Sequence, residues 1–324
     1  MIWAAIAKHS IWQTQLRKSC KNTMKPIIIH EVGLRDGLQM EKQIVPTVQK
    51  IKWAEEFLTT RIDILQLGSF VHPTKVPQMA DTDVLFEHFN QPEHKPNNVI
   101  LSGLILNEKG LERGEVCGVG MYCMGVSASN THSRKNTGMS TIEATDRIIA
   151  TAKQAIAAGK RVQLSVQSAF GCGFEGKVPQ ERVIGIVEKY LQAGFKNISL
   201  ADTAGHAYPE QVMRMFETVF QIDSSIECTC HFHNTYGLGL ANCYAAMRVG
   251  VQCFESSIAG LGGCPFTKVA VGNVCTEDLV HSLQRSEIRK DIKLSNLIVL
   301  AKEFAGYFNR EMPGLVYKSG PIQY

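Results

Sequence analysis

The sequence predicts an α/β protein: a closed (β/α)8 barrel with a helical appendage at its C-terminal end. Eight short apolar segments alternate with longer segments of helical periodicity between residues 26 and 286. Such alternation is typical of a parallel sheet covered by helices, and eight units in about 250 residues suit a barrel. An open, doubly wound sheet remains the alternative fold.

The predicted strands are short and rich in Ile, Val and Leu. They span residues 26–31, 62–67, 98–101, 119–125, 162–166, 197–200, 226–231 and 251–255. The clearest helical patterns lie at 46–60, 141–158, 179–193, 208–221 and 238–249. Three of these helices are followed by Gly159, Gly194 and Gly250, and a glycine at this place favours a left-handed cap before the next strand.

The two ends of the chain depart from the barrel pattern. Residues 287–324 contain one further helical stretch near 295–309, which indicates an appendage packed on a barrel domain of residues 24–286. Residues 1–23 form an N-terminal extension with four basic residues and no acidic one. A targeting peptide, a disordered tail and an upstream start codon ahead of Met24 all fit this composition.

The overall composition is that of a globular protein with a large core. The chain has 324 residues, 44% hydrophobic and 20% charged, and a formal net charge of +4 without a long basic run, so neither nucleic-acid nor membrane binding is predicted. Its ten cysteines form no C-x-x-C pair, which indicates a reducing compartment. We therefore expect a cytoplasmic protein, or a mitochondrial matrix protein if residues 1–23 are a targeting peptide.

Polar side chains gather at the predicted strand ends, where the active sites of barrels lie. The Arg35-Asp36 pair follows the first strand, and His231 and His233 end the seventh. The two histidines are two residues apart, so both point to one face of a strand. With Asp36 they suit an open Mg²⁺, Mn²⁺ or Zn²⁺ centre, but a pair of hydrogen-bonded core histidines fits the spacing equally well.

Cys264 follows a glycine-rich loop after the eighth strand. Three glycines precede it within five residues, and Pro265 follows it. A thiol is mostly protonated at neutral pH, so it can act as an acid as well as a nucleophile. We expect a function for Cys264, whereas most other cysteines suit the role of small buried hydrophobic residues.

Several segments, taken in order, resemble the 3-hydroxy-3-methylglutaryl-CoA (HMG-CoA) lyase family, which belongs to a wider group of metal-dependent TIM-barrel lyases and Claisen-type synthases. The similarity covers roughly residues 26–285. The matching segments are EVGLRDGLQMEK (31–42), GSFVHPTKVPQMADT (68–82), SLADTAGHAYP (199–209), HFHNTYGLGLAN (231–242), SSIAGLGGCPF (256–266) and GNVCTEDLV (272–280).

This resemblance implies a reaction and a set of roles. A 3-hydroxyacyl-CoA, by default HMG-CoA, would be cleaved to acetyl-CoA and a keto acid, here acetoacetate. Arg35 would polarise the thioester carbonyl, Cys264 would act as an acid, and Asp36 would take part in catalysis as well as in metal binding. Barrels of this family often form homodimers. The implied ligands of a divalent cation, Mg²⁺ or Mn²⁺, are Asp36, His231, His233 and Asn273, and the implied substrate or supporting residues are Gln66, Ser69, Asp202 and Asn234.

Four positions depart from the family pattern. Gln66 stands where the family usually carries glutamate, Asn234 where it has aspartate, and Ser165 where the lyases often have tyrosine, and Asn130 replaces a further acid. We expect all four on the pocket side of the barrel, where the loss of an acid or a phenol would change the substrate. Other functions that fit are cleavage of a different acyl-CoA, the condensation direction, and a catalytically silent acyl-CoA binder.

Overall fold

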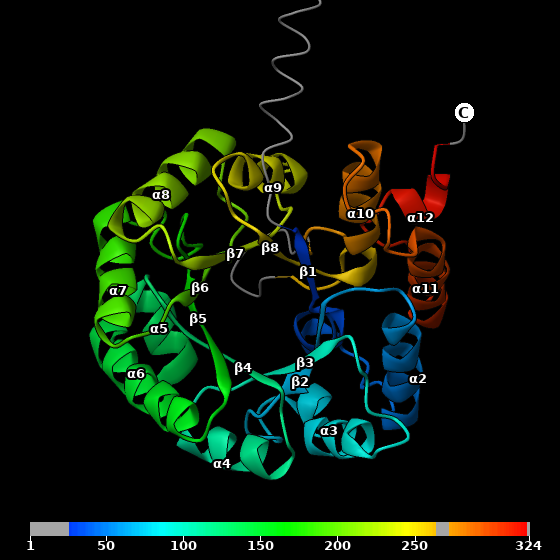
Figure 1. The fold of residues 1–324 in the computed structure, drawn as a ribbon, viewed down its shortest axis with the longest axis horizontal. Helices are drawn as coiled ribbons and strands as arrows, with labels where there is room; N and C mark the ends of the chain where they lie inside the picture. The colour runs from blue at the N-terminus through cyan, green and yellow to red at the C-terminus, as the bar shows by residue number, and fades with distance from the viewer. Residues whose placement is uncertain (1–25, 264–271, 323–324) are drawn as a thin grey trace, which may run out of the picture.

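The computed structural model describes residues 26–263 and 272–322 and contains a closed eight-stranded barrel. All eight strands are parallel, each pairs with its neighbours in chain order, and β1 pairs with β8 to close the ring. Figure 1 shows this ring inside a layer of helices. The barrel predicted from the sequence is therefore confirmed, and the open sheet is excluded.

The strands lie within two residues of their predicted starts. They are β1 (Ile28–Glu31), β2 (Ile64–Ser69), β3 (Ile100–Leu104), β4 (Met121–Ser127), β5 (Arg161–Gln167), β6 (Asn197–Asp202), β7 (Glu227–Phe232) and β8 (Cys253–Ser256).

The helices that cover the sheet follow the strands in alternation. They are α2 (Thr47–Leu58), α3 (Thr82–Asn90), α4 (Glu108–Val116), α5 (Asn130–Thr137), α6 (Thr141–Ala157), α7 (Gln180–Gln192), α8 (Pro209–Ile222), α9 (Gly239–Arg248) and α10 (Thr276–Arg285). Gly159, Gly194 and Gly250 have φ values of +74°, +93° and +104°, which confirms the predicted left-handed caps after α6, α7 and α9.

Two apolar cores hold the barrel together. The larger one lies between the strands and the helices. A smaller one, formed by Ile64, Met121, Cys123 and Cys253, comes from alternate strands and is separate from the first. Side chains from alternate strands filling a barrel in layers are the expected packing of this fold. The apolar layer leaves the carboxyl ends of the strands to polar residues.

The C-terminal helices pack against the outside of the barrel. They are α11 (Leu294–Tyr307) and α12 (Val316–Ser319). The rings of Trp53 on α2 and Phe304 on α11 stack with centroids 3.9 Å apart, and both side chains are buried. Figure 1 shows α10, α11 and α12 grouped beside α2. Within the described residues, no helix is both long and apolar enough to cross a membrane.

Candidate metal centre and cavity

A wide helical turn after β1 carries Arg35 and Asp36. In this turn, η1 (Gly33–Gly37), the backbone N–H groups of Asp36 and Gly37 both donate to the carbonyl of Val32, at 2.8 and 3.3 Å. A bond that spans five residues widens the turn, and such turns are frequent at functional sites. The turn places Asp36 beside the ends of β7 and β8.

Glu31, at the end of β1, ties this turn to two other segments. Its side chain is fully buried and accepts hydrogen bonds from the backbone of Gly33 at 2.7 Å and of Ile258 at 3.0 Å. It also accepts one from the hydroxyl of Thr276, at the start of α10. Burial raises the pKa of Glu31 to about 7. This carboxyl group therefore fixes the relative positions of η1, the loop after β8 and the start of α10.

His231 and His233 end β7 and approach Asp36. The distances from Asp36 Oδ2 to His231 Nε2 and to His233 Nε2 are both 3.9 Å. All three side chains are buried. A distance of 3.9 Å is too long for a hydrogen bond. Two ligands of one ion, each about 2.1 Å from it, lie about 3.0 Å apart when adjacent and about 4.2 Å apart when opposite.

Asn273 joins this group through a short backbone pairing. The residues around it pair with the end of β7, because Val274 N donates to Phe232 O and Asn234 N donates to Gly272 O. The amide of Asn273 donates to Asp36 Oδ2 at 2.8 Å and to the carbonyl of Leu261 at 3.0 Å. Its amide oxygen is buried and has no hydrogen-bond partner among the described residues.

These four side chains fit a divalent cation. They offer one carboxylate, two imidazole nitrogens and one amide oxygen, a donor set that suits Mg²⁺, Mn²⁺ or Zn²⁺. The ligand atoms of Asp36, His231 and His233 lie within 4.8 Å of one another. The unpartnered oxygen of Asn273 is the further observation, because a buried amide oxygen without a partner costs free energy that a bound ion would offset.

Glu255 on β8 fixes the orientation of His231. Its carboxylate accepts a hydrogen bond from Nδ1 of His231 at 2.8 Å. This partner holds a proton on Nδ1, so that with an ion bound Nε2, which faces Asp36, would offer its lone pair to the ion. The other carboxylate oxygen lies 3.6 Å from Nδ1 of His30, whose Nε2 is 2.8 Å from the hydroxyl of Ser102.

The electrostatic surroundings keep Asp36 ionised. Burial favours its neutral form, but the Arg35 guanidinium, both imidazoles and the bond from Asn273 outweigh burial and hold its pKa well below the usual range. Burial lowers the pKa of His30 to about 4, so that this imidazole is neutral. Asp36 is thus an anion at neutral pH, as a metal ligand requires.

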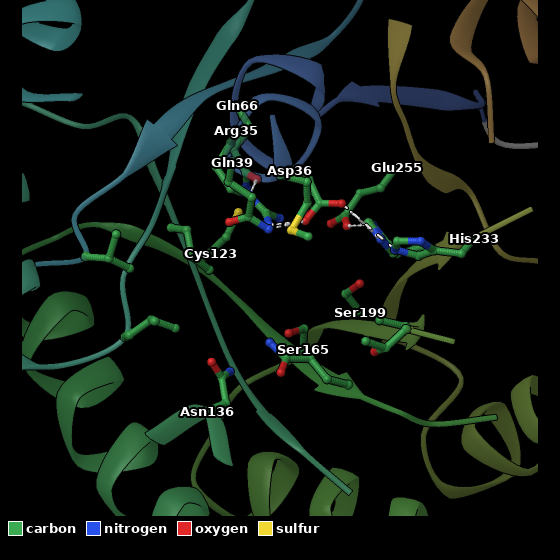
Figure 2. A pocket seen from close by; sticks show the side chains of 18 of the residues that line it. Arg35, Asp36, Gln39, Gln66, Cys123, Asn136, Ser165, Ser199, His233 and Glu255 are labelled. Atoms are coloured by element: carbon green, nitrogen blue, oxygen red, sulfur yellow. Dashed lines mark hydrogen bonds and ion pairs between the residues drawn. The ribbon is translucent and has the colours of Figure 1, made fainter. Parts of the chain in front are cut away.

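A cavity of about 340 Å³ opens beside these residues. Figure 2 shows Arg35, Asp36 and Gln66 on one side, with Ser165 and Ser199 across the cavity from them. Its described lining is formed by Arg35, Asp36, Gln39, Met40, Gln66, Val71, Val76, Leu104, Leu106, Cys123, His132, Asn136, Gln163, Ser165, Gln167, Ser199, Ala201, Thr203, His231, His233, Glu255 and Gly263.

Arg35 is held at the edge of the cavity by two neighbours. Its Nε donates to the amide oxygen of Gln66, and one terminal nitrogen donates to Asp36. Asp36 also accepts a bond from the amide of Gln39 at 3.0 Å. The guanidinium is therefore oriented beside the candidate metal ligands, where it can stabilise a negative oxygen of a substrate.

Other predicted site residues lie outside the cavity lining. Asp202 is buried and accepts bonds from the backbone of His206 and Ala207 at 2.8 and 3.0 Å, so it shapes the loop after β6. Burial raises the pKa of Asp202 to about 6. Ser69 is buried at the end of β2, where its backbone N–H donates to Thr82. Cys264 lies outside the described residues.

The four departures from the family pattern separate into two groups. Gln66 and Ser165 line the cavity, as expected. Asn234 and Asn130 do not: Asn234 accepts a bond from the backbone of Gly239 at the start of α9, and Asn130 accepts one from Thr141 at the start of α6. Their amide oxygens accept bonds from backbone N–H groups, and neither residue is among the described residues that line the cavity.

Glu255 and Glu31 were missed from the sequence. Glu255 was assigned only to the end of the eighth strand. A carboxylate that ends an otherwise apolar buried strand was the available signal, because such a group needs a buried partner. Glu31 has the same signal at the end of the first strand.

Comparison with known proteins identifies relatives over most of the chain. The HMGL-like family profile matches residues 26–303. The hydroxymethylglutaryl-CoA lyase YngG of Bacillus subtilis is 34% identical over 289 residues, which are 89% of this chain and 95% of that protein. The (R)-citramalyl-CoA lyase of Chloroflexus aurantiacus is 33% identical, over 92% of this chain and 96% of the relative.

Solved structures agree with these matches. An HMG-CoA lyase of A. baumannii in complex with coenzyme A and 3-methylmalate has a TM-score of 0.85 and 37% identity, covering 91% of this chain and 95% of that one. The Bacillus subtilis HMG-CoA lyase has a TM-score of 0.86 and 33% identity, covering 91% of this chain and 98% of the other.

Proposed function

We propose that this chain, which belongs to the HMGL-like family of carbon–carbon lyases, cleaves a 3-hydroxyacyl-CoA with the help of a divalent cation. HMG-CoA is the first substrate to test, with acetyl-CoA and acetoacetate as products. The observation that carries the proposal is the group of Asp36, His231, His233 and Asn273 beside Arg35, at the edge of a cavity in a barrel.

The chemistry asks for negative charge to be stabilised at two oxygens in turn, the hydroxyl oxygen on C3 and the thioester oxygen. Breaking the C2–C3 bond requires the hydroxyl on C3 to lose its proton, while the electron pair of that bond moves into the thioester as an enolate. A bound Mg²⁺ or Mn²⁺ would lower the pKa of the hydroxyl. Asp36, His231, His233 and Asn273 would hold the ion.

Arg35 would act on the thioester side. Its guanidinium is fixed by Gln66 and Asp36 and donates hydrogen bonds without losing its charge, so it suits an oxygen that becomes negative. A proton must then reach C2 of the enolate. We assign this role to Cys264, on the resemblance of its loop to the family motif.

A second candidate substrate is citramalyl-CoA. A relative named (R)-citramalyl-CoA lyase is 33% identical to this chain, against 34% for the Bacillus subtilis hydroxymethylglutaryl-CoA lyase. The two departures in the cavity, Gln66 and Ser165, also favour a test beyond the default substrate. Both compounds are thioesters with a hydroxyl group on C3, so one mechanism serves both.

The experiment is a panel of hydroxyacyl-CoA thioesters incubated with the purified full chain. HMG-CoA, both enantiomers of citramalyl-CoA and 3-hydroxybutyryl-CoA are supplied with Mg²⁺ or Mn²⁺, and acetyl-CoA and the keto acid or aldehyde product are measured. We expect release of acetyl-CoA that stops when the cation is chelated. A panel in which no member releases acetyl-CoA with either cation would reject the proposed function.

A further inference from the structure

Gln66 points into the barrel because it lies two residues after Ile64, a member of the smaller core, whereas Leu65 and Leu67 belong to the larger one. In the pairing of β2 with β3, Gln66 is opposite Ser102 but Gly68 is opposite Gly103, so β2 carries one extra residue between them. Such a bulge at the rim of a barrel re-aims nearby side chains. The Gln66 side chain is buried and lines the cavity together with Arg35 and Cys123 (Figure 2).

The neighbours of Gln66 fix which way its amide points. Arg35 Nε can only donate, so the atom of Gln66 that it contacts must be the oxygen. The NH₂ group therefore lies on the other side of the planar amide, where Gln66 interacts with Cys123. Burial raises the pKa of Cys123 to about 12, so this partner is a neutral thiol and a weak acceptor. The NH₂ group has two hydrogens, and a thiol takes one of them.

The charge of the site depends on this residue being an amide. Among the described lining residues, the permanently charged ones are Arg35, Asp36 and Glu255. With a divalent cation bound, the negative charges of the two carboxylates would cancel the two positive charges of the ion. The charge of Arg35 would then give the site a net charge of one positive unit. A carboxylate at position 66, the family's usual residue, would pair with Arg35 and cancel that unit. The reaction generates one negative charge on the substrate, so in this chain the amide leaves more positive charge to stabilise it than the family's usual carboxylate would.

We propose that Gln66 is a catalytic residue that binds the thioester oxygen of the substrate together with Arg35. One N–H of Gln66 and the guanidinium donate to the carbonyl oxygen of the hydroxyacyl-CoA and hold it when it becomes the enolate oxygen. Gln66 transfers no proton: the hydroxyl on C3 releases its proton to water, C2 gains one from the acid assigned above, which recovers a proton from water, and the electron pair of the broken bond becomes the enolate. This assignment rests on the proposed lyase function.

Two variants test the assignment. Gln66→Met keeps the size of the side chain but has no N–H donor, and Gln66→Glu adds a charge that pairs with Arg35. A matched control is Gln154→Glu, the same chemical change at an exposed position of α6. For each variant we would measure kcat and KM on the panel member that the wild type cleaves fastest, and the dissociation constants for Mn²⁺ and acetyl-CoA.

The expected pattern separates Gln66 from a residue that only supports the fold. Gln66→Met should lower kcat about 100-fold, the usual effect of losing one oxyanion donor, and should leave the affinity for Mn²⁺ within about 3-fold. Gln66→Glu should lower kcat further and weaken acetyl-CoA binding, yet bind Mn²⁺ at least as tightly as the wild type, because it adds a negative charge. A damaged fold would lower kcat, the affinity for Mn²⁺ and the affinity for acetyl-CoA together.

Contrary results are equally clear. A Gln66→Met variant with the kcat of the wild type, or a Gln66→Glu variant faster than the wild type, would overturn the role of Gln66. If the wild type cleaves no panel member, the proposed function fails instead. The dissociation constant for acetyl-CoA then still tests the contact between Gln66 and the thioester oxygen. If the contact exists, Gln66→Met should bind acetyl-CoA about 10-fold more weakly than the wild type. Equal binding by the two proteins would reject the contact.

Discussion

Two regions of this protein have the same composition but different architecture. The mouth cluster consists of Asp36, His231 and His233, and the surface cluster consists of Glu55 on α2, His88 on α3 and His94 after α3. Each has one carboxylate and two imidazoles, with ligand atoms within 4.8 Å of one another. The mouth cluster is buried, whereas Glu55 is exposed and both histidines of the surface cluster are partly exposed.

The clusters differ in the orientation of their rings. The His231 and His233 rings are inclined by 51°, with centroids 5.1 Å apart. The His88 and His94 rings stack at 4.1 Å and 22°. A histidine binds a metal through a lone pair in its ring plane, and two stacked rings cannot both aim such lone pairs at one ion between them. Proximity of suitable residues is therefore not enough, because a site also needs the orientation that a buried scaffold enforces.

The largest effect should come from removing the carboxylate of each cluster. Asp36→Asn should lower the affinity for Mn²⁺ and the turnover of the best panel substrate by on the order of a thousandfold, since an ion contributes several kcal/mol to the reaction. The matched change in the surface cluster, Glu55→Gln, should alter both by less than about 2-fold. Equal effects of the two substitutions would mean that the comparison is wrong.

The next effect concerns the group that orients the mouth cluster. Glu255→Gln should weaken Mn²⁺ binding about 10- to 100-fold, because it replaces the carboxylate that fixes the tautomer of His231 by a neutral amide, which is a weaker acceptor and can also present its NH₂ group to Nδ1. Calorimetric titration with Mn²⁺ measures this, and circular dichroism checks that the variant is folded. A folded variant that binds Mn²⁺ as tightly as the wild type would show that ring orientation does not depend on Glu255.

Particular residues show how far the sequence could predict this architecture. The alternation of apolar segments predicted all eight strands, because a buried parallel strand has a strong composition signal. Asp36, His231 and His233 were predicted together because all of them follow strands that end at one face of the barrel. By contrast, four helices, α3, α4, α5 and α10, were not assigned individually, since short polar helices such as α5 have a weak periodic signal.

What could not be predicted depends on contacts between distant segments. Asn273 was found through the family resemblance, because its position depends on a backbone pairing with β7 that no local pattern reveals. Glu255 was missed because its role depends on how far its side chain reaches toward His231. The bonds that Asn130 and Asn234 accept from the backbone at the starts of α6 and α9 were not predicted either.

A third group with ligand-like composition sharpens the comparison through its response to pH. It consists of Cys275, Glu277 and Asp278, all buried. Burial raises the pKa of Glu277 to about 8, in contrast to Asp36, whose partners lower its pKa. In the unfolded chain a glutamate has its ordinary pKa of about 4.3. The folded state therefore binds the proton of Glu277 more tightly, and stability should fall as pH rises from about 4.3 to 8 and then level off.

Removing this carboxyl group should flatten the pH dependence of stability. Relative to the wild type, Glu277→Gln should gain about 1–3 kcal/mol in free energy of unfolding between pH 5.5 and pH 8.5, since one pKa unit corresponds to about 1.4 kcal/mol. Urea denaturation at the two pH values measures the gain. Glu31, with its pKa near 7, keeps part of the slope in both proteins. A variant with the same slope as the wild type would contradict the raised pKa of Glu277.

The smallest effect should come from the histidines of the surface cluster. His94→Ala removes the ring that stacks on His88, but His88 keeps its edge contact with Phe89 at 4.8 Å, so the free energy of unfolding should change by less than about 1 kcal/mol.

The number of Mn²⁺ or Zn²⁺ ions bound per chain is a more informative measurement on the same variant. His88 Nε2 lies 3.7 Å from Glu55, a distance that an ion could bridge, yet the stacked rings oppose a second ligand. Titration of the wild type and of His94→Ala should therefore give the same single tight site. The contrary result is a second tight site in the wild type that is absent from His94→Ala. It would mean that exposed side chains reorient to bind an ion, and that burial is not required to form a metal site in this fold.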